Sequence, residues 1–443
     1  MLVEEHPVRY SGPIAGPARW YSDTTRLLRI EIWLIVLIPS RYVIGPLGGI
    51  GWPAALGGMV LLGAWAVGTL AGQPGLRPCP PLRMVLGAVW ATWLFSYLLM
   101  NFRGVPWDEA GNADRLLISL LSWTGIALAA GEGVQGSRNR LLLVRAVVDA
   151  IAVMAFVALL QFRLGWEPVD LLGKIPLLRA NSDFGGVLSR SSFRRPAGTA
   201  GHPIEYGIIV SSGLALSIHV LLHDHDRSRR RRWMPFGMIA LGIPIAISRS
   251  ALLVTLAVLI VFWCGERRAV RLRALAVIAL MGGFVFTTIP GLIGTLRGFV
   301  LAGNSDSSIS TRTSDYAAVA PFLRRAPWTG RGPGTFLPRY FILDNQYLAS
   351  LIEVGLVGTL ALIALLLSPY WFGRGARHRA TSESDRNLGQ MFAAAGASAV
   401  VAAATYDLLS FGMFAALLFL YVGLSAGFRA DLCSPATAVG SRL

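Results

Sequence analysis

Charged side chains are scarce in this sequence. Asp, Glu, Lys and Arg make up 14% of its 443 residues, whereas soluble domains carry about 25%. Hydrophobic residues make up 54% of the chain, and several apolar stretches exceed the roughly 18 residues that cross a bilayer core. This composition excludes an ordinary soluble domain and predicts an integral membrane protein.

Cysteine and lysine are also rare. Cys79, Cys264 and Cys433 show neither metal-ligand nor disulfide spacing, so we expect no metal site. Lys174 is the only lysine, and the formal net charge of +16 comes from arginine. In a soluble protein such a charge would suggest nucleic acid. Basic loops of a membrane protein instead face anionic lipid and cytoplasm, so we expect membrane lipids as partners and no nucleic acid.

Apolar segments of spanning length recur about twelve times, which predicts an all-α integral membrane protein with about twelve transmembrane helices. We find no internal repeat and no soluble domain of independent size, so residues 1–443 should form a single polytopic membrane domain. The predicted spans are 28–46, 53–71, 84–101, 116–130, 141–162, 203–222, 234–247, 251–264, 274–289, 345–367, 388–405 and 408–428.

Short loops rich in arginine set the predicted orientation. The runs Arg229–Arg232, Arg267–Arg273 and Arg374–Arg379 mark three loops as cytoplasmic. With alternating spans both termini then lie inside, and residues 429–443 form a cytoplasmic tail. We therefore expect a multi-pass protein of the bacterial cytoplasmic (inner) membrane.

This orientation places two longer intervals outside the cytoplasm. Residues 163–202 form the predicted first extracytoplasmic loop, and residues 291–343 form a second, larger one before a late helix. Both are rich in arginine, against the usual bias. Long loops escape that bias, so these arginines can be incidental. The alternative, which we favour, is an anion site on the outer face.

The first interval ends in an arginine- and glycine-rich stretch, Arg194–Ile204. Glycine lets the backbone approach a ligand closely, and arginine offers paired donors to phosphate. Pro203 suits the first turn of a helix. His202, just before it, either makes a structural hydrogen bond, which we favour, or binds substrate.

Ser248-Arg249-Ser250 separates two apolar segments and predicts a tight turn at the outer boundary. A charge near membrane depth is costly, so Arg249 either extends to the interface or has a function. The apolar sequence on both sides favours a function.

The region 311–358 carries a third set of signals. Glycines within Trp328–Phe336 require irregular backbone close to another group. Asp344 and Asn345 precede a predicted span, where capping of the helix N-terminus is one explanation of Asp344. Glu353 lies about two turns deeper, and an acid there is costly unless it is paired.

The run His223-Asp224-His225-Asp226 has the residue types of a metal cluster. It precedes an arginine run in a predicted cytoplasmic loop, so we interpret it as a solvated loop.

In this order and spacing, these pieces resemble the O-antigen ligase and O-antigen polymerase superfamily of bacterial membrane glycosyltransferases. The similarity is strongest from Arg195 to Gly358. The pieces that carry it are Arg195-Pro196-x-Gly198 with His202-Pro203, Ser248-Arg249-Ser250-Ala251, Arg312, Gly330-x-Gly332-x-Gly334-x-Phe336, Asp344-Asn345-x-x-Leu348 and Glu353-x-Gly355.

The resemblance implies an enzyme that needs no metal or cofactor. Such enzymes transfer or polymerise a glycan carried on undecaprenyl diphosphate, and a glycan or lipid acceptor receives it outside the cytoplasmic membrane. Family arginines grip the donor diphosphate. The positions carried over are Arg195, Arg249 and Arg312, with Arg331 and Arg339 as weaker additions. We add His202, Asn345 and Glu353 as expected substrate-binding residues.

One departure from the family pattern concerns the catalytic base. Ligases of the family typically have a histidine before the late asparagine, where this chain has Asp344. A carboxylate can also accept the acceptor's proton, so Asp344 is the expected base. The change favours a polymerase, or a ligase for an acceptor other than lipid A core.

Two other functions stay open. Twelve spans also suit a transporter or lipid-glycan flippase, although the sequence shows neither a repeat nor a matched pair of broken helices. A non-catalytic scaffold of an envelope-polysaccharide complex is the third alternative. Sugar, acceptor, stereochemistry and oligomeric state are not fixed by the sequence.

Overall fold

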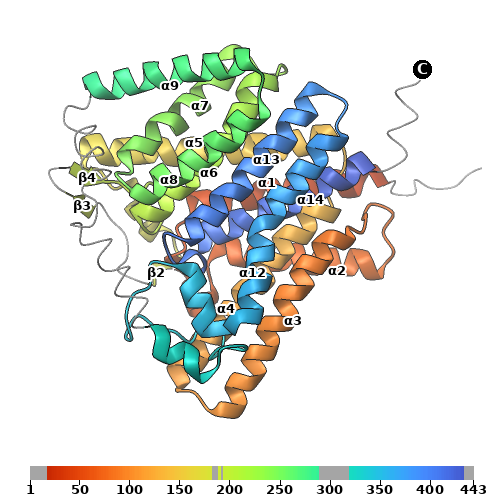
Figure 1. Cartoon of the computed structure of the whole chain (residues 1–443), viewed down its shortest axis with the longest axis vertical. Helices are drawn as coiled ribbons and strands as arrows, with labels where there is room; N and C mark the ends of the chain where they lie inside the picture. Colours follow the sequence, from red (N-terminus) through yellow and green to blue (C-terminus); the bar gives the residue numbers. More distant parts are fainter. Residues whose placement is uncertain (1–16, 182–187, 191–192, 289–318, 434–443) are drawn as a thin grey trace, which may run out of the picture.

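The computed structural model describes residues 17–181, 188–190, 193–288 and 319–433. These residues include twelve α-helices with the bounds given below, a further helical segment at 319–325, and a few short strands and 3-10 turns (Figure 1). The helices are α1 (Pro17–Leu37), α2 (Pro53–Leu70), α3 (Pro80–Arg103), α4 (Trp107–Glu132), α5 (Ser137–Leu164), α6 (Pro203–His223), α7 (Arg229–Ile245), α8 (Arg249–Gly265), α9 (Arg268–Thr288), α12 (Gln346–Arg379), α13 (Glu383–Ala403) and α14 (Gly412–Cys433).

The all-α membrane class is confirmed. Seven described helices are long and apolar enough to cross a membrane: α2, α3, α4, α5, α6, α12 and α14. Each of the twelve predicted spans overlaps a helix, but the number of membrane crossings stays a prediction.

The first predicted span, 28–46, is misplaced. α1 begins at Pro17 and ends at Leu37, because Pro39 disfavours helix in the residue before it. The remaining residues form strand β1 (Tyr42–Ile44) and the 3-10 turn η1 (Gly45–Ile50).

Short strands, which the sequence did not predict, order part of the interval 163–202. After the 3-10 turn η2 (Pro168–Lys174), β2 (Leu178–Ala180) pairs antiparallel with β1, and β3 (Leu188–Arg190) pairs with β4 (Phe193–Arg195). The first pair fastens the interval to the connection between α1 and α2.

The helices alternate in direction, so their ends gather in two groups. One group, the basic end, holds Arg83 beside Glu132 at 2.7 Å and Arg140 beside Asp431 at 2.5 Å. The opposite group, the loop end, holds the described residues of the interval 163–202 and residues 319–345, with contacts from Gln161 of α5 to Gly198 and from Arg103 of α3 to Gly330. Described residues of the loops predicted to be cytoplasmic lie at the basic end, where Arg267 pairs with Glu383 at 3.8 Å, and those of the loops predicted to be outside lie at the loop end, where Arg331 pairs with Glu109 at 2.6 Å. The side of the membrane that each end faces stays a prediction.

Close helix packing in the interior depends on small residues. A Cβ atom at Gly423 of α14 would lie 2.3 Å from the carbonyl oxygen of Ala127 in α4. One at Gly427 would lie 2.5 Å from that of Gly131. Glycine therefore brings these two backbones together, as is common between membrane helices.

α12 is a broken helix. Gly355 has φ 66° and ψ −172°, which is not helical. In Figure 1, α12 lies beside α3, although the two are far apart in the sequence. The hydroxyl of Ser96 in α3 donates to the carbonyl of Glu353 at 3.1 Å, just before the break.

Candidate functional site

The turn between α7 and α8 presents Arg249 at the loop end. Ser248 caps α8 by accepting a hydrogen bond from the backbone N–H of Ala251 at 3.4 Å, and Arg249 is the first helical residue. The tight turn predicted here is confirmed. Ile247 is buried with φ 45°, a strained conformation for a β-branched residue.

Arg195 lies against this turn. It ends β4, is 8% exposed, and its Nε donates to the carbonyl of Ala246 at 3.5 Å. Arg195 and Arg249 are therefore brought to the same turn from different elements. Arg312, the third arginine of the predicted diphosphate site, lies outside the described residues.

His202 caps α6. Its Nδ1 accepts a hydrogen bond from the N–H of Ile204 at 3.1 Å, so the predicted structural hydrogen bond is confirmed. Burial lowers the pKa of His202 to about 4, and the charge of Arg195 adds to the effect. The imidazole is therefore neutral near pH 7, and its ring packs 6.0 Å from that of Phe411.

Glu205, one turn into α6, was not among the predicted site residues. Its buried carboxylate accepts hydrogen bonds from the N–H groups of Gly201 at 3.2 Å, Met413 at 3.1 Å and Phe414 at 3.2 Å. It thereby caps α14 and holds that helix against the start of α6. An isolated acid in an apolar segment was the signal available in the sequence.

Asp344 and Asn345, the two polar residues just before α12, have different roles. Asn345 is the cap, because its Oδ1 accepts from the N–H groups of Tyr347 at 3.0 Å and Leu348 at 3.2 Å. Asp344 precedes it and is exposed to solvent. Asn345, and not Asp344, therefore caps the helix.

Asp407, also missed by the sequence analysis, joins Asp344 at this site. It lies between α13 and the 3-10 turn η4 (Leu408–Ser410) and accepts a hydrogen bond from Ser410. Burial raises the pKa of Asp407 to about 6; the hydrogen bond from Ser410 opposes this, and the negative charge of Asp344 adds to it. The N–H of Leu409 donates to Gln346 Oε1 at 2.7 Å, which fixes this turn against the start of α12.

The glycine-rich loop 327–336 lies across the break in α12. The N–H groups of Arg331 and Gly332 donate to the carbonyls of Ile352 and Glu353, each at 2.8 Å. In the other direction, the N–H of Leu356 donates to the carbonyl of Pro327 at 2.9 Å. The loop thus satisfies backbone groups that a continuous helix would have paired internally.

The glycines make this contact possible. A Cβ atom at Gly330 would lie 2.2 Å from the carbonyl oxygen of Glu353, and one at Gly355 would lie 2.4 Å from the backbone of Trp328. The partner that the glycine pattern predicted is therefore the broken helix. The Glu353 carboxylate also turns to the loop, where it accepts from the N–H of Phe336 at 3.2 Å.

Arg331 and Arg339 form ion pairs with α4. Arg331 lies 2.6 Å from Glu109 Oε2, and Arg339 lies 2.6 Å from Glu109 Oε1 and also pairs with Asp108. Tyr340 donates to Glu109 as well. Acids of the protein thus compensate both charges, and the network attaches the loop to the start of α4.

The predicted residues fall into two sets. Arg195, Arg249 and His202 gather where β4, α6 and α8 meet, and Asp344, with Asp407, lies at the start of α12. Contacts link the two sets, because the ring of Phe411 packs 6.0 Å from His202 and 5.2 Å from Tyr406, which precedes Asp407. Within the described residues, no three His, Cys, Asp or Glu side chains are grouped to hold a metal ion.

Comparison with known proteins identifies a family over part of the chain. Residues 234–363 match the family model for O-antigen ligase. The match runs from α7 into α12 and includes Arg249, Asp344 and Glu353. No curated protein matches the sequence. The match covers residues 234–363 alone; it supports the resemblance of this region to the O-antigen ligase and polymerase superfamily and, in general terms, a membrane glycosyltransferase type of enzyme.

Proposed function

We propose that this protein transfers or polymerises a glycan carried on a polyprenyl diphosphate, at the outer face of the bacterial cytoplasmic membrane. The donor belongs to the undecaprenyl-diphosphate class, and the acceptor is a glycan or a lipid. The proposal rests on one observation: Arg195 contacts the turn that carries Arg249. Arg249 lies within the region that matches O-antigen ligase, and Arg195 precedes that region in the sequence.

In this proposal the two guanidinium groups hold the donor diphosphate. Each offers planar paired donors to phosphate oxygens. As the bond from the anomeric carbon to the diphosphate breaks, negative charge grows on the leaving group, and the arginines stabilise it without a metal ion. Arg312 is expected to join them.

Asp344 serves as the proposed general base. Its exposed carboxylate accepts the proton of the acceptor hydroxyl while the oxygen forms the new glycosidic bond. Asp407 lies close enough for the charge of Asp344 to raise its pKa, so the two carboxyl groups interact at this site. We assign Asn345, Glu353, Arg331 and Arg339 to shaping the site, because their side chains are used in the cap, the loop and the α4 network.

A transporter or flippase is the alternative. The broken helix α12 resembles the interrupted helices of transporters, but those come as matched pairs. Among the described α-helices, α12 alone contains a non-helical residue.

The proposed reaction is tested with purified protein in liposomes that contain polyprenyl-diphosphate-linked repeat units and candidate acceptors. We expect glycan lengthening or transfer, with release of polyprenyl diphosphate, and loss of both in Arg249→Ala. Arg325→Ala is the matched control, because Arg325 is exposed near the same end. Movement of the lipid across the bilayer without a new glycan product would establish a flippase instead. Normal transfer by Arg249→Ala would remove the assigned role of Arg249.

A further inference from the structure

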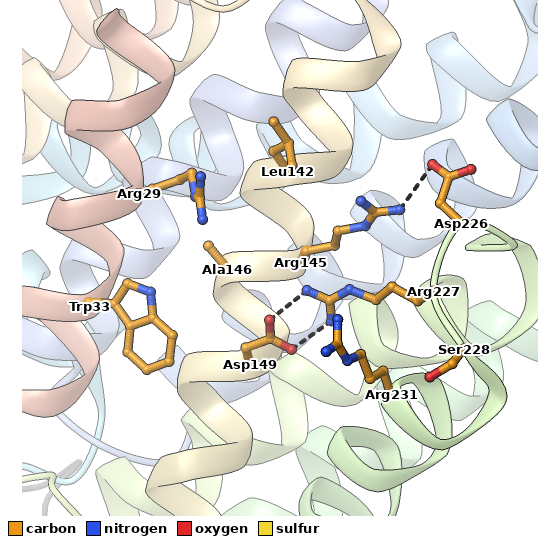
Figure 2. Close-up of a pocket in the computed structure, with 10 residues that line it drawn as sticks. All are labelled: Arg29, Trp33, Leu142, Arg145, Ala146, Asp149, Asp226, Arg227, Ser228 and Arg231. Carbon is orange, nitrogen blue, oxygen red and sulfur yellow. Dashed lines mark hydrogen bonds and ion pairs between the residues drawn. The ribbon is translucent and has the colours of Figure 1, made fainter. Parts of the chain in front are cut away.

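A cavity of about 670 Å³ opens at the basic end, away from the proposed transfer site. It lies between α1, α5 and the connection from α6 to α7 (Figure 2). Four arginines line it: Arg29, Arg145, Arg227 and Arg231.

Two of these arginines are held in place by acids. Arg227 donates to both carboxylate oxygens of Asp149, at 2.8 and 2.6 Å. Arg145 donates to Asp224 at 2.7 Å and to Asp226 at 3.2 Å. Asp224 is buried, so the run 223–226 is not simply the solvated loop that the sequence suggested. These ion pairs hold Arg145 and Arg227 in place and form one wall of the cavity.

The other two arginines make no hydrogen bond or ion pair with any residue in the described part of the chain. Arg29 projects from α1 and Arg231 from α7, and Figure 2 shows their guanidinium groups beside the cavity on different helices. Counting Asp149, Asp224 and Asp226 against the four arginines leaves one net positive charge, which a phosphodiester would balance.

An apolar surface continues from the cavity along α5. Leu142, Ala146 and Asp149 line the cavity, and spacings of three and four residues place Val153 and Phe156 on the same face. Val153 is 39% exposed and Phe156 is 46% exposed. In a membrane helix such exposed apolar side chains face acyl chains. The charged cavity and the apolar face therefore match the two parts of a phospholipid.

We propose that this cavity binds the headgroup of an anionic phospholipid with one phosphodiester charge. Arg29 and Arg231 contact the phosphate, the wall of Arg145 and Arg227 provides a positive field, and the acyl chains lie along Val153 and Phe156. Basic pockets between membrane helices commonly bind lipid headgroups in this way.

Native mass spectrometry of the full-length protein with added phosphatidylglycerol tests this site. The double variant Arg29→Gln/Arg231→Gln removes the two arginines for which the described residues supply no partner. Near a membrane surface each arginine contributes about fivefold in affinity, so we expect about 25-fold weaker binding. The matched control Arg229→Gln/Arg230→Gln removes two exposed charges outside the cavity, and we expect a change of about twofold or less.

Three results would overturn the proposal. Equal loss in both double variants would mean general attraction to a basic surface. Equal binding of phosphatidylcholine would exclude selection by charge. Competition by inorganic phosphate at the concentration of the lipid would mean that the site takes free phosphate.

A second variant covers the case in which the double variant is unstable. Ser228 lines the cavity at the N-cap position of α7. Because aspartate is also a favoured N-cap, Ser228→Asp keeps the helix start while placing a negative charge at the site. We expect it to remain folded and to bind phosphatidylglycerol at least fivefold more weakly; affinity equal to that of the original protein would count against the headgroup site.

Discussion

Gly355 is the residue on which the broken helix depends. With φ 66° and ψ −172°, it occupies a region of backbone conformation that is essentially restricted to glycine. In Gly355→Ala, the new Cβ atom would lie 2.4 Å from the backbone of Trp328. The side chain of one alanine therefore forces either strain in α12 or withdrawal of the loop 327–336.

Such strain costs about 1–3 kcal/mol. If withdrawal of the loop 327–336 from α12 relieves this strain, the state with the loop withdrawn is stabilised by that free energy relative to the state with the loop in contact. Amide exchange through local opening then becomes about 5- to 150-fold faster. The amides of Arg331 and Gly332 report on this directly, because they donate across the break at 2.8 Å. Hydrogen–deuterium exchange of a peptide covering 327–336 provides the measurement.

Gly87→Ala in α3 is the control for this change. A Cβ atom at Gly87 would meet nothing within 4 Å, so exchange in the loop should stay at the original rate. If Gly355→Ala also left the loop amides unchanged, the reasoning about the break would be refuted.

The remaining predictions concern acidic residues. Asp344→Asn should lower transfer at least ~100-fold, as expected for loss of a general base, with unchanged donor binding; unchanged turnover would exclude Asp344 as the base. Glu109→Gln leaves half-buried Arg331 without its counter-charge at a cost of ~3 kcal/mol, so trypsin should cleave after Arg331 and Arg339 much faster, while cleavage after exposed Arg325 stays constant. Asp407→Asn tests the raised pKa of about 6. Because the folded state holds this proton more tightly than the unfolded state, the wild type loses stability as pH rises from about 4 to about 6, and the variant does not. Between pH 4 and pH 6 the thermal midpoint of the variant should therefore rise relative to that of the wild type. If the difference between the two midpoints stayed constant with pH, the raised pKa of Asp407 would be contradicted.

Much of the fold follows from local properties of the sequence. Apolar segments long enough to span a membrane predict helices from their length alone. A polar interruption between two such segments, as at Ser248, predicts a turn. The glycines of 328–336 correctly indicated close backbone contact. The segment that these glycines contact could not be predicted. The backbone groups left unpaired by the break at Gly355 bond to the loop 327–336, and the sequence does not show that the two are adjacent.

The site was predictable only in part, for the same reason. Arg195 reaches the turn that carries Arg249 because it donates to the carbonyl of Ala246 between α7 and α8, and neither residue's neighbours in the sequence reveal this. Asp407 gains its raised pKa from burial and from Asp344, which is distant in the chain. The uses of Arg331 and Arg339 depend on Glu109, which belongs to another helix. Tertiary partners thus decide the use of each arginine, and the sequence alone does not identify those partners.

The central claim is that Arg195 and Arg249 hold the donor diphosphate. Its most direct test is the dissociation constant of undecaprenyl diphosphate for the purified protein, compared with Arg195→Ala, Arg249→Ala and the control Arg325→Ala. A charge-assisted hydrogen bond contributes about 1.5–3 kcal/mol, so each of the first two variants should bind about 10- to 150-fold more weakly, while the control binds as the original protein does. Equal affinity in all four proteins would contradict the account.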